Sequence, residues 1–311
     1  GESGSGKSVT ALSLLGLINP KKVLYKSTNS ILFEGRELTS LSENEWQDIR
    51  GNEIGMVFQE PMSSLNPLMK VGEQVAEVIR VHKRVSEKKA RARARYLLRL
   101  VGIDHADERM EAYPFELSGG QRQRVMIAMA VANHPKVLIA DEPTTALDVT
   151  IQAQILQLIR DLQKELGMSV IYITHDLGVV ANVADRVAVM YAGQIVEYGT
   201  VEEIFYDAWH PYTWALLQAL PQLGTKGEAL PTIDGTPPNL FNEIKGDAFA
   251  PRNKHALAID FVAEPPFFQV SETHAAKTWY LDPRAPKMER PHSIQNLREK
   301  MGKMGGSNLN G

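Results

Sequence analysis

The chain has no cysteine among its 311 residues. This absence excludes disulfide bonds, thiolate metal sites and cysteine-ligated iron–sulfur clusters. Long apolar runs are also missing, because the most apolar stretch, VMIAMAVA at 125–132, falls well short of the ~18 residues that a membrane-spanning helix needs. Neither sign of charge dominates, since 34 Lys and Arg stand against 37 Asp and Glu. The net charge of −3 provides no overall basic field of the kind that attracts nucleic acid.

What the sequence does contain begins with a glycine-rich stretch. Residues 1–8, GESGSGKS, fit the pattern G-x-x-x-x-G-K-[ST] at every fixed position. Such a loop surrounds a phosphate chain with backbone N–H groups, while Lys7 reaches the β- and γ-phosphates and the Ser8 hydroxyl binds Mg²⁺. The following TALSLLGLI has helical spacing, so the phosphates would lie at the positive end of a helix. A glycine-rich turn that matches by chance is the alternative at this point.

The start of the sequence carries a separate expectation. A loop of this kind normally follows a buried strand, and here neither a strand nor an initiator Met precedes it. We therefore expect the sequence to be a fragment that lacks this first strand and the residues before it.

Strand-like and helix-like patterns alternate along the chain. The expected strands are 30–38 with a glycine turn, 54–59, 136–143, 168–176 and two within 185–199 joined at Gly193; the expected helices are 71–83, 86–102 and 151–167. This alternation predicts an α/β fold with a parallel sheet and crossover helices, in which 136–143 and 168–176 are buried strands. The block 68–124 interrupts it and predicts an inserted helical subdomain. After Tyr206 the sequence is Pro-rich and less periodic, which indicates an appended segment with a disordered tail at 301–311.

Two acidic residues end the strand pattern KVLIADEP at 136–143. Phosphate-loop chemistry needs an acidic residue there to orient Mg²⁺, and Asp141 supplies it. Glu142 follows where a water could attack the γ-phosphate, which favours a role as general base. Solvated acids at a strand end are the alternative, and the glycine loop makes that alternative weak.

A second helix start resembles an anion site. In ELSGGQRQR, 116–124, a Ser and two glycines open an apolar helix and leave backbone N–H groups available. One phosphate loop does not need a second anion site, but two copies could each complete the other's site across a two-fold interface. An ordinary Ser N-cap is the alternative.

Together these stretches resemble a known family. GESGSGKS, FQEPMSSLNP, LSGGQRQR, VLIADEPTTALD and ITHD are similar, in order and spacing, to the motifs of the ATP-binding subunit of ABC transporters. The resemblance implies a P-loop, RecA-like ATPase domain over 1–205 with a helical subdomain at about 68–124. It further implies that the first strand and the adenine-stacking region of that domain are not in this chain. ATP and Mg²⁺ are the implied cofactors.

The same resemblance implies roles for individual residues. Glu142, His175 and Gln59 would be catalytic, with His175 holding the γ-phosphate, and Asp148 would lie in a loop at the dimer interface. Mg²⁺ would be bound by Ser8, Gln59 and Asp141. The nucleotide would contact the glycine loop of its own subunit through Gly1, Ser3, Gly4, Ser5, Gly6, Lys7, Ser8 and Val9. It would also contact the signature residues of the opposing subunit, which are Ser118, Gly119, Gly120 and Gln121.

The segment after Tyr206 narrows the resemblance. YDAWHPYTWALLQALPQL, 206–223, resembles the C-terminal extension of oligopeptide and dipeptide importers, where H-P-Y-T precedes a short apolar helix. It implies that 206–311 form that extension and that the chain is an ATPase powering peptide import at the cytoplasmic side of the cell membrane. The implied partners are a second ABC ATPase subunit, two membrane-spanning permease subunits and, indirectly, an extracytoplasmic peptide-binding protein, with no nucleic acid. Packing of Trp209, Tyr212 and Trp214 onto the core is the expected role of the rings.

Other functions stay open at this stage. Nickel, opine or oligosaccharide import shares this type of extension. An ABC ATPase acting on nucleic acid would need a long coiled coil or tandem nucleotide domains, and the sequence has neither heptads nor a repeated motif set. A nucleotide-binding regulator without turnover is disfavoured by the presence of Glu142 and His175.

The extension departs from many relatives at four positions. Where they carry cysteines that can hold an iron–sulfur cluster, this sequence has Asp247, Asn253, Asp260 and Thr278. No cluster can form on these side chains. Either hydrogen bonds replace the cluster or a hard cation such as Ca²⁺ binds, and the thin ligand set favours hydrogen bonds.

The run RVHKRVSEKKARARARYLLRL at 80–100 is strongly basic. A solvated helix face is the usual meaning of such a run, and phosphate recognition is the weaker alternative. The family resemblance adds that this helical block and the loop after Gln59 form a groove for a coupling helix of a membrane subunit.

Overall fold

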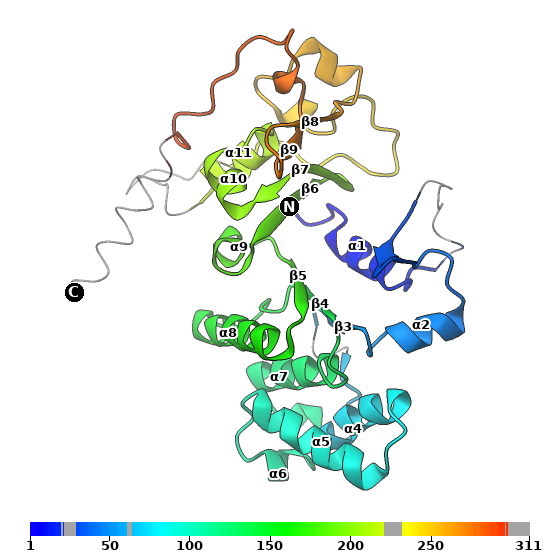
Figure 1. The fold of residues 1–311 in the computed structure, drawn as a ribbon. Coiled ribbons are helices and arrows are strands. Elements are labelled where there is room, and N and C mark those ends of the chain that lie inside the picture. Colours follow the sequence, from blue (N-terminus) through cyan, green and yellow to red (C-terminus); the bar gives the residue numbers. More distant parts are fainter. Residues whose placement is uncertain (20, 22–28, 61–63, 221–231, 296, 298–311) are drawn as a thin grey trace, which may run out of the picture. The chain divides into compact units, whose positions relative to one another are not determined.

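A computed structural model describes residues 1–19, 21, 29–60, 64–220, 232–295 and 297 (Figure 1). The chain forms two compact units, one of Gly1–Lys7 with Thr174–Gly311 and one of Ser8–Ile173. Three predictions lie wholly or partly outside the described residues: the tail at 301–311, residues 61–63 of FQEPMSSLNP, and 221–223 of the extension motif. The predicted domain boundary near residue 205 stays a prediction. Within the described residues, no helix is both long and apolar enough to cross a bilayer.

A three-stranded parallel sheet lies at the centre of the Ser8–Ile173 unit. Its strands are β3 (Ile54–Val57), β4 (Val137–Asp141) and β5 (Ser169–Ile173), in the order β3-β4-β5. Helix α8 (Val149–Leu166) connects β4 to β5. The expected parallel sheet with a crossover helix is therefore confirmed for these strands, and the central strand β4 is buried as predicted.

The burial predicted for 168–176 is wrong. Strand β5 alternates between exposed and half-buried residues, and Ile171 is 40% exposed. Its position at the end of the strand order explains this result, because only β4 pairs with it.

Four helices of the block between β3 and β4 have described bounds. They are α4 (Val71–His82), α5 (Glu87–Leu100), the short α6 (Ala106–Arg109) and α7 (Gly119–Ala130), with the 3-10 turn η2 (Pro114–Glu116) before α7. The helices predicted over 71–83 and 86–102 are confirmed. The second ends before Gly102, whose φ of +74° suits glycine. The inward faces of α4, α5 and α7 and strand β4 share one hydrophobic core.

The basic run at 80–100 forms ion pairs within this block. On α5, Arg91 pairs with Glu73 of α4 and with Glu111, while Arg95 and Arg99 pair with Asp107. The opposite face of α5 is buried through Ala90, Ala94, Leu97 and Leu98. This arrangement supports the interpretation of the run as a solvated, salt-bridged helix face.

The beginning of the chain contributes a helix and a hairpin. Helix α1 (Lys7–Leu14) starts in the glycine loop, β1 (Leu32–Phe33) pairs with β2 (Arg36–Glu37), and α2 (Glu43–Ile49) follows. The helical pattern predicted to continue to residue 18 ends at Leu14. Gly16 has a φ of +59°, and a Cβ at this position would lie 2.6 Å from the Trp46 ring. The close approach of Trp46 therefore fixes the end of α1.

The unit formed by Gly1–Lys7 and Thr174–Gly311 contains an antiparallel sheet of order β6-β7-β9-β8. Its strands are β6 (Arg186–Tyr191), β7 (Gln194–Thr200), β8 (Phe267–Gln269) and β9 (Ala275–Lys277). As predicted, β6 and β7 form a hairpin; Ala192 and Gly193, with φ values of +48° and +80°, make its turn.

Short helices complete this unit. They are α9 (Leu177–Val183), α10 (Val201–Tyr206), α11 (Pro211–Gln218) and the 3-10 turns η4 (Ala250–Arg252), η5 (Ala258–Phe261) and η6 (Trp279–Leu281). Helix α11 begins inside the H-P-Y-T motif rather than after it, because Pro211 takes the first helical position and His210 caps it. Tyr212 and Trp214 are buried, as expected, and Trp209 is half-buried.

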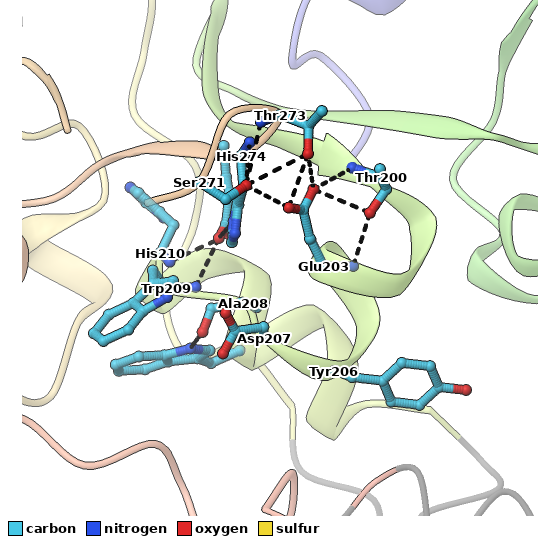
Figure 2. A network of polar contacts seen from close by, with 12 residues as sticks. Thr200, Glu203, Tyr206, Asp207, Ala208, Trp209, His210, Ser271, Thr273 and His274 are labelled. Carbon is cyan, nitrogen blue, oxygen red and sulfur yellow. Dashed lines mark hydrogen bonds and ion pairs between the residues drawn. The ribbon is translucent and has the colours of Figure 1, made fainter. Parts of the chain in front are cut away.

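A buried carboxylate holds the start of α11 to the sheet. Glu197 of β7 is fully buried and accepts the backbone N–H groups of Trp209 (2.6 Å) and His210 (3.2 Å). A 2.9 Å hydrogen bond joins its Oε1 to His274 Nε2. Nearby, Glu203 of α10 accepts hydrogen bonds from Thr200, Ser271 and Thr273, as Figure 2 shows. The extension is thus fixed to β7 and α10 by hydrogen bonds.

Candidate active site

The glycine loop has the backbone that its sequence predicts. Gly4 and Gly6 have φ values of +76° and +96°, which residues with a Cβ rarely adopt. Gly1 has no space for a side chain, because a Cβ would lie 2.1 Å from the Met190 carbonyl oxygen. The backbone N–H of Gly193 donates to the Ser5 carbonyl at 3.0 Å. The β6–β7 hairpin therefore supports the loop from the same unit.

Lys7 folds back over the loop that precedes it. Its Nζ donates to the carbonyl oxygens of Gly1 and Glu2, both at 2.9 Å. The Ser5 hydroxyl is buried and has no hydrogen-bond partner among the described residues. A cationic group and an unpaired buried hydroxyl in one short loop fit a bound phosphate group.

Strand β4 delivers the predicted carboxylates. Asp141 is its last residue and is buried, and Glu142 follows it. Glu142 Oε2 accepts hydrogen bonds from Gln59 Nε2 at 3.1 Å and from Thr145 Oγ1 at 2.9 Å. The structure thus brings together Gln59 and Glu142, which are 83 residues apart in sequence.

The backbone at Glu142 adopts an unusual conformation. Its φ is +46°, in the left-handed region that costs a non-glycine residue about 1 kcal/mol or more. Its N–H donates to the Ile173 carbonyl of β5 at 2.8 Å, which holds this conformation. Strained backbone of this kind concentrates at functional sites.

The signature residues form a capped helix start. The Ser118 hydroxyl accepts the Gln121 N–H at 3.2 Å, and the Gln121 side chain accepts the Ser118 N–H at 3.0 Å. This reciprocal capping box confirms the N-cap interpretation of Ser118. Ser118 is exposed. A Cβ on Gly119 would lie 3.6 Å from Leu147, so the helix start borders the loop that contains Asp148.

Asp148 and His175 lie next to the ends of helix α8 and strand β5. Asp148 caps α8 by accepting the Ile151 N–H at 3.0 Å. His175 is exposed and lies two residues after β5 ends. Residues 1–7 of the glycine loop and His175 belong to one compact unit, and Ser8, the carboxylates, Gln59 and the signature residues belong to the other.

The four extension positions at which the resemblance implies cysteines in relatives are hydrogen-bonded. Asp247 and Asp260 accept the N–H groups of Phe249 (2.9 Å) and Leu257 (2.6 Å). Asn253 donates to the Tyr280 hydroxyl at 2.9 Å, and Thr278 accepts the Tyr280 N–H at 3.3 Å. This is the arrangement that the hydrogen-bond interpretation predicts. No group of three or more acidic or histidine side chains suited to a metal occurs among the described residues.

Burial affects both carboxyl groups at these positions. It raises the pKa of Asp247 from 3.8 to about 6, and it also raises the pKa of Asp260. The neighbouring Asp260 adds to the rise at Asp247 by charge repulsion.

Comparison with known proteins identifies the family. Residues 1–145 match the family model of the ABC transporter, and residues 196–259 match that of the oligopeptide/dipeptide transporter C-terminal region. The oligopeptide transport ATP-binding protein OppD of Bacillus subtilis is 60% identical over 97% of this chain and 84% of its own length. The chain belongs to the ABC transporter ATP-binding proteins.

Two further comparisons agree. The dipeptide transport ATP-binding protein DppD of Lactococcus lactis is 58% identical over 94% of the chain and 84% of its own length. The ATP-binding cassette MJ0796, in a dimeric post-hydrolysis state with ADP and Pi, aligns with a TM-score of 0.56 at 31% identity, covering 64% of this chain and 82% of its own. The predicted fold class, an α/β ABC nucleotide-binding domain with a C-terminal extension, is thereby confirmed, and the chain is an ABC ATPase that binds and hydrolyses ATP.

Sequence reasoning missed some residues that contact this ABC ATPase site. Thr145 lies in the motif VLIADEPTTALD, three residues after Glu142, and this short spacing is the signal that could indicate the contact. Arg252 and Tyr212 contact Glu2 of the glycine loop from more than 200 residues away, and no local signal predicts them.

Proposed function

We propose that this ABC ATPase powers the import of oligopeptides or dipeptides through a membrane transporter. The support is that relatives at 50–60% identity over most of the chain are named for oligopeptide or dipeptide transport. The matched C-terminal region, which carries the same description, adds to it. Nickel, opine and oligosaccharide import are not favoured by these relatives.

The observation that carries the chemical part is the position of Glu142. Gln59 and Thr145 both donate to one of its carboxylate oxygens, which fixes the orientation of the group. We assign Glu142 as the general base. It takes a proton from the water whose oxygen bonds to the γ-phosphorus, while the bond from that phosphorus to the bridging oxygen breaks and ADP leaves. His175 holds the γ-phosphate.

The glycine loop binds the phosphate chain in this proposal. Its backbone N–H groups and Lys7 neutralise the β- and γ-phosphates, and the buried Ser5 hydroxyl gains a partner. Mg²⁺ would be held by Ser8, Asp141 and Gln59, all oxygen ligands that suit this hard cation. When bound, it supplies charge neutralisation on the phosphate oxygens.

A second ATPase subunit completes the site. Ser118, Gly119, Gly120 and Gln121 form an exposed helix start that presents backbone N–H groups to the nucleotide of the partner. Asp148 lies beside this surface, in the loop that ends at α8. ATP therefore joins two subunits, and hydrolysis separates them.

A hollow in the Ser8–Ile173 unit fits an apolar helix of a permease subunit. It has a volume of about 380 Å³ and is lined by Met56, Phe58, Ser64, Met126 and Met129. Methionine side chains adapt to an inserted apolar group. Phe58 directly precedes Gln59, so a helix seated here is coupled to the residue that contacts Glu142. In this proposal the chain works at the cytoplasmic face of the membrane.

Growth tests the proposal. A strain lacking this subunit should fail to grow when a di- or oligopeptide is the sole source of a required amino acid, and it should grow on the free amino acid. The wild-type chain and the surface variant Glu272→Gln should restore growth on peptide, whereas Glu142→Gln should not. Unimpaired peptide growth of the deletion strain, with loss of nickel or oligosaccharide uptake, would overturn the peptide assignment.

A further inference from the structure

We infer that Arg252 of the C-terminal extension is a positioning residue for the phosphate loop, acting through Glu2. The inference rests on the proposed role of the glycine loop as the phosphate site. It adds a residue outside every nucleotide motif and gives the extension a direct effect on nucleotide affinity.

Glu2 is the centre of this arrangement. Its carboxylate accepts two hydrogen bonds from Arg252, at 2.6 Å and 3.1 Å. Its backbone N–H donates to the Tyr212 hydroxyl at 2.7 Å. Its carbonyl oxygen accepts from Lys7 Nζ at 2.9 Å. Glu2 therefore connects two residues of the extension to the lysine that binds phosphate.

Arg252 is held rigidly at its own end. Its side chain is only 5% exposed, and its guanidinium lies over the rings of Tyr191 and Phe249. Besides Glu2, it donates to the carbonyl oxygens of Ile233 and Asp234 and to the Tyr191 hydroxyl. A buried guanidinium with this many fixed partners keeps a single orientation. Because it donates two hydrogen bonds to the Glu2 carboxylate, it also fixes the orientation of that carboxylate.

The segment bound by Arg252 also lies against the loop. Pro237, Pro238 and Leu240 line a hollow of about 10 Å³ together with Glu2, Ser3 and Gly4. That volume holds roughly one water molecule, so the segment lies close to the loop at Glu2, Ser3 and Gly4. Pre-ordering of a binding loop improves affinity because the ordering cost is met before the ligand arrives.

The test measures ATP affinity of the full chain at equilibrium. Arg252→Gln, Glu2→Gln and Tyr212→Phe should each raise the ATP Kd about fivefold or more, within the range of coupling between sites. The Kd of the double variant Arg252→Gln/Glu2→Gln for ATP should not exceed the higher Kd of the two single variants, because both changes break the same Arg252–Glu2 connection. Arg252→Lys should recover only part of the affinity, since it keeps the charge and loses the paired hydrogen bonds.

Two controls separate the possible outcomes. Lys254→Gln breaks the exposed Lys254–Asp234 ion pair close by and should leave the Kd unchanged. Lys7→Ala should abolish tight binding, and retention of ATP affinity there would refute the proposed phosphate site itself. If folded Arg252→Gln and Tyr212→Phe both keep the wild-type Kd for ATP while Lys7→Ala loses ATP binding, the positioning role is overturned and the proposed phosphate site is not. If Arg252→Gln does not fold, Glu2→Gln decides, because it weakens the same Arg252–Glu2 connection from the other end.

Discussion

At the scale of single residues, Glu142 combines a left-handed backbone with a carboxylate held by two donors. Glutamine has the same size and can still accept both hydrogen bonds through its amide oxygen. It cannot take a proton from the attacking water. The substitution therefore keeps the side chain in its hydrogen-bonded position and removes only its ability to accept the proton.

We predict that Glu142→Gln lowers the steady-state rate of ATP hydrolysis by about 100-fold or more, the range expected for loss of a general base. ATP affinity should stay within about threefold of wild type, because the phosphate contacts are unchanged. Phosphate release and equilibrium ATP binding measure the two quantities, with Glu272→Gln as the matched control. Rapid turnover by Glu142→Gln would show that another group acts as the base.

Residues whose role depends on short sequence spacing could be predicted. The glycine pattern places Lys7 and Ser8, and the end of a buried strand places Asp141 and Glu142. Arg252 could not be found in this way, because its contact with Glu2 spans 250 residues. Such contacts depend on how distant segments fold together.

At the scale of elements, His210 joins α11 to the sheet. Its Nδ1 accepts the Tyr212 N–H at 3.1 Å as the helix N-cap, while Glu197 accepts its backbone N–H. Burial, together with a smaller effect of the Lys277 charge, lowers the pKa of His210 from 6.5 to about 3. The folded protein therefore keeps this imidazole neutral at pH values where the unfolded chain protonates it. The stabilisation from this difference is complete above pH 6.5 and is lost as the pH falls toward 3.

We predict that His210→Asn reduces the loss of stability in acid. Asparagine can cap α11 in the same way but does not titrate. Between pH 7 and pH 5 the free energy of unfolding of the wild type should fall by about 2 kcal/mol more than that of the variant. Denaturant unfolding at both pH values measures this difference.

The buried Asp247 works in the opposite direction. Its pKa of about 6 lies above the ordinary 3.8, so its contribution is lost as the pH rises through 6. It is present in both proteins and cancels in the comparison with His210→Asn. An equal loss of stability in wild type and His210→Asn would contradict the prediction.

Element types could be predicted, while element ends and burial could not. Helical and strand periodicity located α4, α5, α8 and the β6–β7 hairpin. The end of α1 depends on the contact of Gly16 with Trp46, and the exposure of β5 depends on its place in the strand order. Both are set by residues outside the local pattern.

At the scale of the whole molecule, the proposed motor needs two chains. The Ser118 helix start is exposed, and a side chain at Gly119 would meet only Leu147, at an ordinary contact distance of 3.6 Å. An aspartate at this position can therefore be accommodated, and its charge would repel the phosphates of an opposing nucleotide.

We predict that Glu142→Gln forms a dimer with ATP in analytical ultracentrifugation and stays a monomer with ADP. Adding Gly119→Asp should abolish the ATP-dependent dimer. Adding Ser86→Asp instead should not, because Ser86 is exposed, lies outside every motif and is the N-cap residue of α5, a position that accepts aspartate. A dimer that persists with Gly119→Asp would refute the shared site.

The connection between residues 2 and 252 also has a consequence for biosynthesis. A ribosome adds about 5–20 residues per second, so Arg252 is made roughly 12–50 s after Glu2. During that interval the nascent phosphate loop lacks its guanidinium anchor. A polypeptide that terminates before Arg252 would therefore lack this anchor, and we expect its phosphate loop to bind nucleotide more weakly.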